Sequence, residues 1–474
     1  MGKKILLQAF YWEMCTNSYK EKFKEECNLW NLLAKKAASL AESGFASVWI
    51  PPATKGNAGD KDIGYGVYDI WDLGEFEQKG SKRTKYGTKE ELIKALEKLH
   101  SHGIKVFFDA VLNHRFGADQ TEIVQLKNGT EAEVWTRYDF PGRNEKYSRY
   151  KLNYSSFDGV DWDERTKKLG KILFSDKDWD WSYGEDFLMG ADLDYNNKKV
   201  QRDVLNWGKW IINDLGFDGF RIDAAKHIDQ GFLRTFIKKV NENSSKELFF
   251  GAEAWIEEED ELIDFIKQID AKALKVFDYP LRSKFVELKH RNLDMRSLKN
   301  AGLVNNKKYQ DRVITFVDTH DTDRDQIDDD NIESISHYKY HAYAYILLRD
   351  KGLPTIYWKD YYTREMSEKL DLLIKARQTY AYGQGLESSA TDQKTYCYLR
   401  EDEYQDTGLV MLLTIDDSND IIKKEIQTHS PNTEYFDITG HLEQPIRTDQ
   451  EGMGCFSVIA SEEKGWSVWV KKSN

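Results

Sequence analysis

Residues 217–227 read Phe217-Asp218-Gly219-Phe220-Arg221-Ile222-Asp223-Ala224-Ala225-Lys226-His227, a short apolar run that ends in charged side chains. The apolar half is typical of a buried β-strand. Burying unpaired ionisable groups is costly, so core packing does not explain why four of them fall within positions 221–227. A hydrophobic strand that ends in charge is typical of a parallel barrel, which presents its active site at the carboxyl ends of its strands.

A helix is predicted just before this strand. Apolar side chains recur there at spacings of three and four residues, and Gly216 supplies the stop signal expected after a helix. Similar signals occur earlier, where Thr88 and Glu91 form a predicted capping box at the start of a helix that Gly103 ends. The positions that define the first apolar face are Val200, Val204, Trp207, Ile211 and Leu215.

Eight short apolar runs along the chain can form strands, and most of them follow a helical pattern. Alternating helices and strands indicate βαβ units, and eight units favour a closed (β/α)8 TIM barrel over an open doubly wound sheet. No glycine-rich phosphate-binding sequence follows the first run, which argues against a nucleotide-binding fold. The runs are Ile5–Phe10, Ala46–Ile50, Lys105–Ala110, Phe217–Ile222, Leu248–Glu253, Leu274–Asp278, Arg312–Val317 and Pro354–Trp358.

The alternation of helical and strand patterns is interrupted once and later ends. This predicts three parts in the 474-residue chain. We expect residues 1–113 and 193–390 to form the barrel. Residues 114–192 are aromatic and acidic and have no helical period, so we expect an inserted, loop-rich domain after the third strand. Short β-type runs between turn residues predict a C-terminal antiparallel domain, a β-sandwich, over residues 391–474.

Composition narrows the class of protein and its compartment. The net charge of −13 argues against a nucleic-acid partner, and no apolar stretch approaches the roughly 20 residues that span a membrane. The amino terminus is too short and too aromatic in its apolar part for a signal peptide. The four cysteines lack metal-type spacing. We therefore expect a cytoplasmic protein with reduced thiols; a secreted protein whose signal peptide has been removed is the alternative.

Carboxylates follow several of the predicted strands, and the strand ends of a barrel converge on one face. Carboxylates brought together raise one another's pKa, so one can donate a proton while another stays ionised, as glycoside hydrolysis requires. Arg221 lies on the same side of its strand as Asp223 and is expected to keep it ionised. Glu253, beside Trp255, is the better proton donor. The strand-end acids are Asp109, Asp223, Glu253 and Asp321.

Each of these residues also has an ordinary structural interpretation. A single aspartate at a strand end is more often a helix cap or an ion-pair partner, and His114 or His320 alone is more often a hydrogen-bonded loop residue. Several such ends on one predicted face favour a site. Acidic clusters in barrels also bind Mg²⁺ for enolase-like or decarboxylation chemistry, so the pattern predicts a site without specifying its reaction.

A series of motifs, in order along nearly the whole chain, resembles the alpha-amylase family of glycoside hydrolases, most closely its liquefying and intracellular bacterial members. The chain departs from that pattern at Ala254 and Thr319, where relatives often carry tyrosine and asparagine, and at Gly190, where several extracellular members carry an aromatic residue. The motifs are Leu7–Trp12, Gly64–Asp69, Asp72–Phe76, Asp109–His114, Leu188–Tyr195, Gly219–His227, the segment around Glu253, and Phe316–Asp321.

This resemblance implies an endo-acting enzyme that hydrolyses α-1,4 bonds in starch, glycogen or maltodextrins with retention of configuration. Asp223 is the implied nucleophile, Glu253 the implied acid and base, and Asp321 the implied stabiliser of the oxocarbenium-like transition state. Tyr65 is implied to stack on the sugar. The other implied substrate ligands are His114, Arg221, Lys226, His227, Trp255 and His320.

The resemblance also implies a structural calcium ion between the insertion and the barrel. Ca²⁺ takes six to eight oxygen ligands, and an acidic loop without helices has little reason to order without a cation. The alternative is that the aspartates are turn residues on a solvated surface. The implied ligands are Asn113, Asp158, Asp180, Asp186, Asp192 and the backbone carbonyl of His227.

Three other functions compete with an endo-acting amylase. An exo-acting hydrolase that produces maltooligosaccharides, or a transglycosylase of the same family, would use the same carboxylates. A catalytically silent carbohydrate-binding protein would lack at least one of the three acids, and all three are present. A Mg²⁺-dependent lyase would need further metal ligands at the strand ends. We expect the chain to act as a monomer on an α-glucan, without a nucleic-acid or membrane partner.

Overall fold

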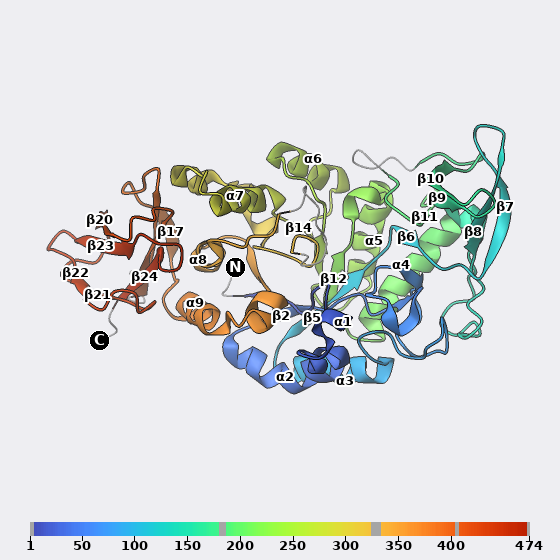
Figure 1. Ribbon diagram of the computed structural model, residues 1–474, viewed down its shortest axis with the longest axis horizontal. Coiled ribbons are helices and arrows are strands. Elements are labelled where there is room, and N and C mark those ends of the chain that lie inside the picture. Colours follow the sequence, from blue (N-terminus) through green and yellow to red (C-terminus); the bar gives the residue numbers. More distant parts are fainter. Residues whose placement is uncertain (1–3, 180–185, 324–332, 403–406, 472–474) are drawn as a thin grey trace.

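The computed structural model describes residues 4–179, 186–323, 333–402 and 407–471. At its centre eight parallel strands close into a barrel in the order β1-β16-β15-β14-β13-β12-β5-β2 (Figure 1), which confirms the predicted fold class. Each strand lies within or overlaps one of the eight predicted runs. The strands are β1 (Leu6–Gln8), β2 (Ser47–Trp49), β5 (Lys105–Ala110), β12 (Gly219–Ile222), β13 (Phe249–Ala252), β14 (Leu274–Phe277), β15 (Val313–Thr315) and β16 (Leu353–Tyr357).

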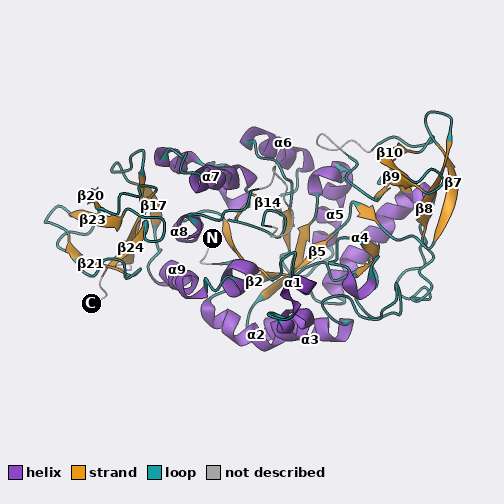
Figure 2. Cartoon of the chain, in the orientation of Figure 1, coloured by secondary structure: helices purple, strands orange, loops and turns teal. Residues whose placement is uncertain are grey.

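Helices alternate with these strands and surround them (Figure 2). The predicted capping box is present at the start of α3: Thr88 Oγ1 accepts from Glu91 N at 3.3 Å, and Glu91 Oε2 accepts from Thr88 N at 2.8 Å. Gly44 ends α2 at φ 99°, which glycine adopts without steric cost. The helices are α1 (Asn17–Lys20), α2 (Leu29–Ser43), α3 (Lys89–Ser101), α4 (Lys198–Asn213), α5 (Gln230–Glu242), α6 (Glu259–Ile269), α7 (Tyr279–Lys289), α8 (Lys339–Leu348) and α9 (Ser367–Thr379).

The insertion after β5 contains more strand than the sequence indicated. A four-stranded sheet has the order β10-β9-β11-β6, and β7 and β8 form a separate hairpin. Polar residues on the outer faces of these strands dilute the apolar signal: β8 alternates between buried and exposed positions, yet only Ala132, Val134 and Trp135 in it are apolar. The strands are β6 (His114–Arg115), β7 (Gln120–Gln125), β8 (Glu131–Arg137), β9 (Phe157–Asp163), β10 (Lys168–Leu173) and β11 (Ala191–Leu193). Before the insertion, β3 (Lys55–Gly56) and β4 (Val67–Asp69) form a short hairpin.

The C-terminal part is antiparallel, as predicted, and lies at the opposite end of the molecule from the insertion (Figure 1). It packs on α8, where His341 Nε2 lies 2.9 Å from Thr414 O and the Tyr340 ring stacks on Trp466. A six-stranded sheet (β17-β18-β19-β24-β21-β22) accompanies the pair β20-β23. The strands are β17 (Gln384–Glu387), β18 (Thr395–Asp402), β19 (Thr407–Thr414), β20 (Ile421–Gln427), β21 (Glu434–Asp437), β22 (Ile446–Arg447), β23 (Met453–Ile459) and β24 (Trp466–Lys471).

The four cysteines, Cys15, Cys27, Cys397 and Cys455, are free thiols. In the described part of the chain, no helix has the length and apolar character needed to cross a membrane.

Candidate active site and metal centre

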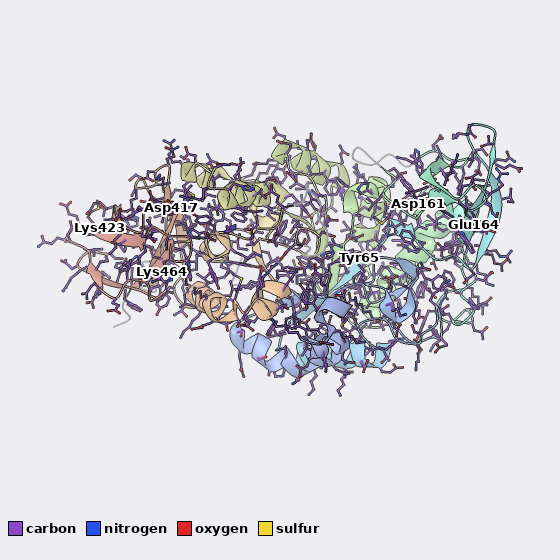
Figure 3. All side chains as sticks on the ribbon, viewed as in Figure 1. Tyr65, Asp161, Glu164, Asp417, Lys423 and Lys464 are labelled. Atoms are coloured by element: carbon purple, nitrogen blue, oxygen red, sulfur yellow. The ribbon has the colours of Figure 1, made fainter. Side chains whose placement is uncertain are left out.

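A cavity of about 290 Å³ opens at the carboxyl ends of the barrel strands. Arg221 lies beneath it and is 1% exposed. Tyr65, which lines the cavity, is labelled in the central part of the molecule in Figure 3. The cavity brings together nine of the residues predicted from the sequence, which are Tyr65, His114, Asp223, Lys226, His227, Glu253, Trp255, His320 and Asp321.

Barrel register places the two central carboxylates at the same level. Arg221 on β12 is opposite Asp109 on β5 and Gly251 on β13. The ladder continues one residue further, because Asp223 N donates to Ala110 O at 3.0 Å and Glu253 N donates to Ile222 O at 2.9 Å. Asp223 and Glu253 are therefore the first residues beyond two adjacent strands, where their side chains face the cavity.

Three carboxylates share the guanidinium of Arg221. Its Nη1 lies 2.9 Å from Asp109 Oδ1 and 2.6 Å from Asp223 Oδ1, and its Nη2 lies 3.6 Å from Glu253 Oε2. One positive charge cannot balance three buried negative charges, so the group retains a proton readily. Glu253 has the longest of the three contacts with Arg221, which makes it the carboxylate best placed to hold that proton.

Burial dominates the pKa values of this group. It raises the pKa of Asp223 to about 7; Arg221 opposes the rise, while Asp109 and Asp321 add to it. Burial likewise raises the pKa values of Glu253 and Asp109. The sequence predicted that Arg221 would keep Asp223 ionised. The guanidinium does lower the pKa of Asp223, but burial and the neighbouring carboxylates outweigh it.

The two oxygens of Glu253 have different partners. Oε2 accepts the backbone N–H of Ala224 at 2.8 Å, and Oε1 accepts the hydroxyl of Tyr279 at 3.1 Å. Ala224 has φ 46°, a strained conformation for alanine, which directs its N–H at the carboxylate. Burial, with the Glu253 carboxylate, raises the pKa of Tyr279 well above its usual range, so the phenol keeps its proton. Oε2 faces both the Ala224 N–H and the Arg221 guanidinium, whereas Oε1 faces one neutral hydroxyl, so the exchangeable proton of Glu253 belongs on Oε1.

Tyr279→Phe should move the basic limb of the kcat/KM pH profile to higher pH. A hydrogen bond to a carboxylate favours its ionised form, so removing the Tyr279 hydroxyl raises the pKa of Glu253 further. The profile is measured on maltoheptaose. The matched control is Tyr345→Phe, because Tyr345 is buried and its hydroxyl donates to Leu298 O at 2.7 Å, away from Glu253. Superimposable profiles for the two variants would contradict this role of Tyr279.

Aromatic rings form one wall of the cavity. Tyr65 donates its hydroxyl to Asp109 Oδ2 at 2.9 Å and stacks on His320, with centroids 5.1 Å apart and an interplanar angle of 11°. Trp12 stacks on both rings at 6.0 Å. Burial lowers the pKa of His114 to about 4, so its imidazole is neutral at pH 7.

Lys226, Trp255 and Asp321 also line the cavity. Lys226 Nζ donates to the carbonyl of Trp255 at 3.2 Å, and the Trp255 ring stacks on Tyr279 with centroids 5.0 Å apart. Gln8 Nε2 lies 3.0 Å from His320 Nδ1, which leaves Nε2 of that imidazole to carry a proton toward Asp321 Oδ2, 3.2 Å away.

Sequence reasoning missed several residues of the site. Trp12, Leu188 and Met189 line the cavity, and Tyr279 contacts Glu253. Trp12 and Met189 belong to the quoted motifs Leu7–Trp12 and Leu188–Tyr195. Trp12 follows the first predicted strand and Met189 lies in the insertion, so both could have been predicted to line the site. Tyr279 follows the sixth predicted strand as part of an ordinary helix start, and nothing in that pattern indicates a contact with Glu253.

A second, larger cavity of about 530 Å³ lies in the insertion; Gly190 and Ala191 line it and directly follow Leu188 and Met189, which line the first. Trp135, 41% exposed, and Trp162 line it and donate their indole N–H groups to Glu164 Oε2 at 3.1 and 2.8 Å. Asp161 and Glu164 are labelled in this part of Figure 3. Two aromatic rings fixed by one carboxylate offer the flat apolar surfaces on which sugar rings stack.

Three of the predicted metal ligands converge in the insertion. Carboxylate oxygens of Asp158, Asp186 and Asp192 all lie within 4.8 Å of one another, and all three side chains are buried. Ca²⁺–oxygen distances of roughly 2.3–2.6 Å place two ligands of one ion up to about 5 Å apart, so the cluster fits a calcium ion. Asn113 Nδ2 donates to Asp192 Oδ1 at 3.2 Å. Asp180 lies outside the described residues, and His227 is buried in the wall of the active-site cavity.

A closed parallel barrel with paired acids around one cavity at its carboxyl face defines a barrel enzyme equipped for glycoside hydrolysis. The family model of the alpha-amylase catalytic domain matches residues 17–367, and that of the alpha-amylase C-terminal domain matches residues 410–470. The chain belongs to the alpha-amylase family of glycoside hydrolases, whose members generally bind structural calcium and act on α-glucans.

Relatives cover nearly the whole chain. An alpha-amylase from Bacillus licheniformis is 37% identical, covering 96% of this chain and 91% of the relative. A glucan 1,4-alpha-maltohexaosidase from Bacillus sp. (strain 707) is 35% identical, covering 94% and 90%. A cytoplasmic alpha-amylase from Escherichia coli (strain K12) is 32% identical, covering 99% of both chains.

Solved structures share the fold. An alpha-amylase from Geobacillus thermoleovorans, complexed with acarbose, superimposes with a TM-score of 0.62 at 17% identity, covering 94% of this chain and 92% of that chain. An Anoxybacillus alpha-amylase gives a TM-score of 0.64 at 15% identity, covering 100% and 99%.

Proposed function

We propose that this enzyme is an endo-acting, retaining alpha-amylase that cleaves α-1,4 bonds in starch, glycogen or maltodextrins, with Asp223 as nucleophile and Glu253 as acid and base. The observation that carries the proposal is that Asp223 and Glu253 bind one guanidinium at the edge of one cavity. This compact arrangement suits the retaining mechanism, in which the carboxyl groups are about 5–5.5 Å apart, better than the inverting one, in which a water separates them.

In the first step Asp223 attacks the anomeric carbon. Its Oδ1 is bound to Arg221, so Oδ2 is the oxygen that forms the glycosyl ester. As the glycosidic bond breaks, Glu253 Oε1 gives its proton to the departing sugar oxygen. Arg221 and the Ala224 N–H then stabilise the carboxylate left on Glu253.

In the second step Glu253 Oε1 takes a proton from a water molecule, which attacks the same carbon and releases Asp223. Asp321 stabilises the positive charge that develops on the sugar ring and accepts hydrogen bonds from its hydroxyls. His114 is neutral and donates from Nε2 to the Tyr65 carbonyl, so its Nδ1 accepts from a sugar hydroxyl without adding repulsion to that charge. Tyr65, His320, Lys226, His227 and Trp255 are the remaining proposed sugar contacts.

We propose calcium as the ion held by Asp158, Asp186 and Asp192, with Asn113, Asp180 and the carbonyl of His227 completing the set. When bound, the ion supplies positive charge that offsets the buried carboxylates. Asp192 on β11 is opposite His114 on β6, so this cluster and the active-site cavity share one sheet of the insertion. The residues of the cluster therefore help to hold His114 in the cavity wall.

The length of the substrate site supports internal cleavage of long chains. Gly190 and Ala191, which line the cavity with Trp135 and Trp162, directly follow Leu188 and Met189 of the catalytic cavity, so a bound glucan can extend in that direction. The maltohexaosidase relative makes release of products of one length the second candidate. In a time course on amylose, endo action gives an early spread of product lengths and a fast fall in viscosity.

A single early product would overturn endo action in favour of the exo-acting alternative. A maltoheptaose digest tests transfer, because products longer than the substrate would identify a transglycosylase. We further propose that the enzyme is a cytoplasmic monomer without nucleic-acid partners. The free thiols, the acidic charge and the cytoplasmic relative from Escherichia coli support this proposal.

A further inference from the structure

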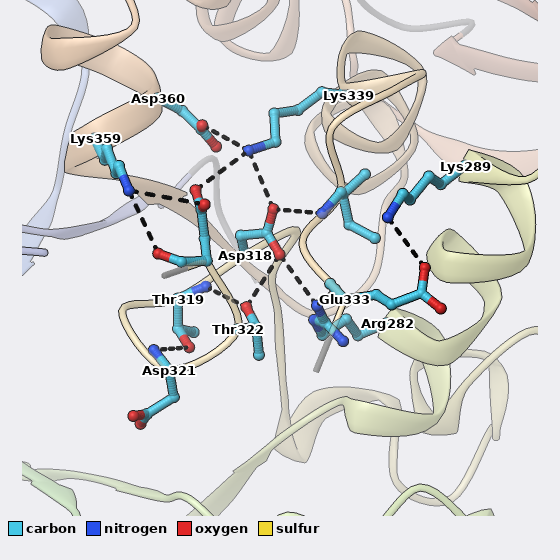
Figure 4. Close-up of polar contacts among 12 residues, drawn as sticks. Arg282, Lys289, Asp318, Thr319, Asp321, Thr322, Glu333, Lys339, Lys359 and Asp360 are labelled. Atoms are coloured by element: carbon cyan, nitrogen blue, oxygen red, sulfur yellow. Dashed lines mark hydrogen bonds and ion pairs between the residues drawn. The ribbon is translucent and has the colours of Figure 1, made fainter. Parts of the chain in front are cut away.

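The turn that follows β15 carries Asp321 and is buried apart from that residue. Asp318 is 1% exposed, Thr319 3% and Thr322 1%. Figure 4 shows the Asp321 carboxylate pointing away from a group of ion pairs that lies beneath the turn. Asp318, Thr319 and Thr322 are not among the residues that line the active-site cavity, whereas Asp321 is, so they can act on a bound sugar through Asp321.

A chain of hydrogen bonds connects this buried group to Asp321. Thr322 Oγ1 donates to Asp318 Oδ1 at 3.0 Å and accepts from Thr319 N at 2.9 Å. Thr319 Oγ1 in turn accepts from Asp321 N at 3.3 Å. Two hydroxyls therefore link the Asp318 carboxylate to the backbone of Asp321 (Figure 4). The Thr319 hydroxyl therefore has a structural role, which is to accept the backbone N–H of Asp321.

Asp318 is itself fixed by charge. Its Oδ2 lies 3.0 Å from Lys339 Nζ and accepts from Ile335 N at 2.9 Å, and its Oδ1 lies 3.2 Å from Arg282 Nη2. Lys339 is anchored on its other side by Asp360 Oδ1 at 2.7 Å. A carboxylate held from two sides by buried cations has one stable orientation, since any other leaves buried charges unpaired.

We propose that Asp318, Thr322 and Thr319, with Lys339 as their anchor, are positioning residues that orient Asp321 toward the sugar; this rests on the role proposed above for Asp321. The consequence is electrostatic as well as geometric. Asp321 is one of the charges that raise the pKa values of Asp223 and Glu253. If the turn loses its fixed conformation, Asp321 moves, and the pKa of Glu253 falls.

Thr322→Val and Thr322→Ser form a matched pair, because valine keeps the shape without the hydroxyl and serine keeps the hydroxyl. The valine variant should lose about 10- to 100-fold in kcat, the cost of a small misplacement at a reacting centre, with little change in KM. The basic limb of its pH profile should move to lower pH. The serine variant should stay within about twofold of the parent. Thr319→Val and Thr319→Ser repeat the comparison should Thr322→Val fail to fold.

Asp321→Asn, alone and combined with Thr322→Val, separates this inference from the proposed function. Near-normal activity of Asp321→Asn would refute the role of Asp321 itself. If that variant is impaired but Thr322→Val behaves like Thr322→Ser, the positioning role is refuted while the function stands. In the Asp321→Asn background, Thr322→Val should add no further loss in kcat. A multiplicative loss there would show that Thr322 acts independently of Asp321 and would overturn the inference.

Discussion

Asp223→Asn should lower kcat/KM on amylose by about 10⁴-fold or more while the protein stays folded, because an amide cannot form the glycosyl ester. Asparagine keeps the shape of the side chain and an oxygen that can accept from Arg221 Nη1, now 2.6 Å from Asp223 Oδ1. The substitution also removes a buried charge whose pKa burial has raised, so the melting temperature should not fall.

Glu253→Gln serves as the chemical control for this assignment. On amylose it should lose about 10²- to 10⁴-fold, the usual contribution of an acid–base group. On α-maltosyl fluoride, whose fluoride leaves without a proton, glycosyl transfer to the enzyme should be much less impaired. The Asp223 variant should fail on both substrates. Near-parental hydrolysis of amylose by either variant would contradict the assignment.

Removing calcium should lower the melting temperature by several degrees, and adding Ca²⁺ back should restore it. An ion present at about 1,000 times its dissociation constant stabilises the folded state by roughly 4 kcal/mol. The three clustered carboxylates repel one another when no cation lies between them. Mg²⁺ should restore less, because it is smaller and demands octahedral geometry. The measurement is thermal unfolding with and without chelator.

Two variants locate the ion. Asp158→Asn removes a buried member of the cluster and should abolish the response of the melting temperature to Ca²⁺. Asp178→Asn removes a carboxylate of the same insertion that is 91% exposed, and its response should remain that of the parent. If exhaustive chelation leaves the melting temperature of the parent unchanged, the metal assignment is wrong.

The barrel was predictable because strong local signals agreed with one another. Helix stops such as Gly44 and the Thr88–Glu91 capping box mark element ends, and apolar runs between them mark the strands. Strand topology then brings strand-end residues together regardless of their distance along the chain. Asp223 and Asp321 could thus be placed around one cavity before any coordinates were known.

Features that depend on three-dimensional packing could not be predicted. The strands of the insertion are mostly polar on one face, so their apolar pattern is weak. The contact of Tyr279 with Glu253 depends on how α7 meets the barrel, and the pKa of Asp223 depends on the sum of burial and three neighbouring charges. Asp180 belongs to a stretch outside the described residues, so its predicted role in metal binding stays a prediction.

Helix α8 connects the C-terminal domain to the turn that carries Asp321. Lys339, its first residue, holds the turn that bears Asp321. Tyr340 and His341, one and two residues further along, contact Trp466 and Thr414 of the C-terminal sheets, respectively. Through α8 the C-terminal domain therefore supports the turn that carries Asp321. A truncated enzyme lacking it should expose the buried His341 imidazole and lose catalytic efficiency, even though none of the described C-terminal residues lines the active-site cavity.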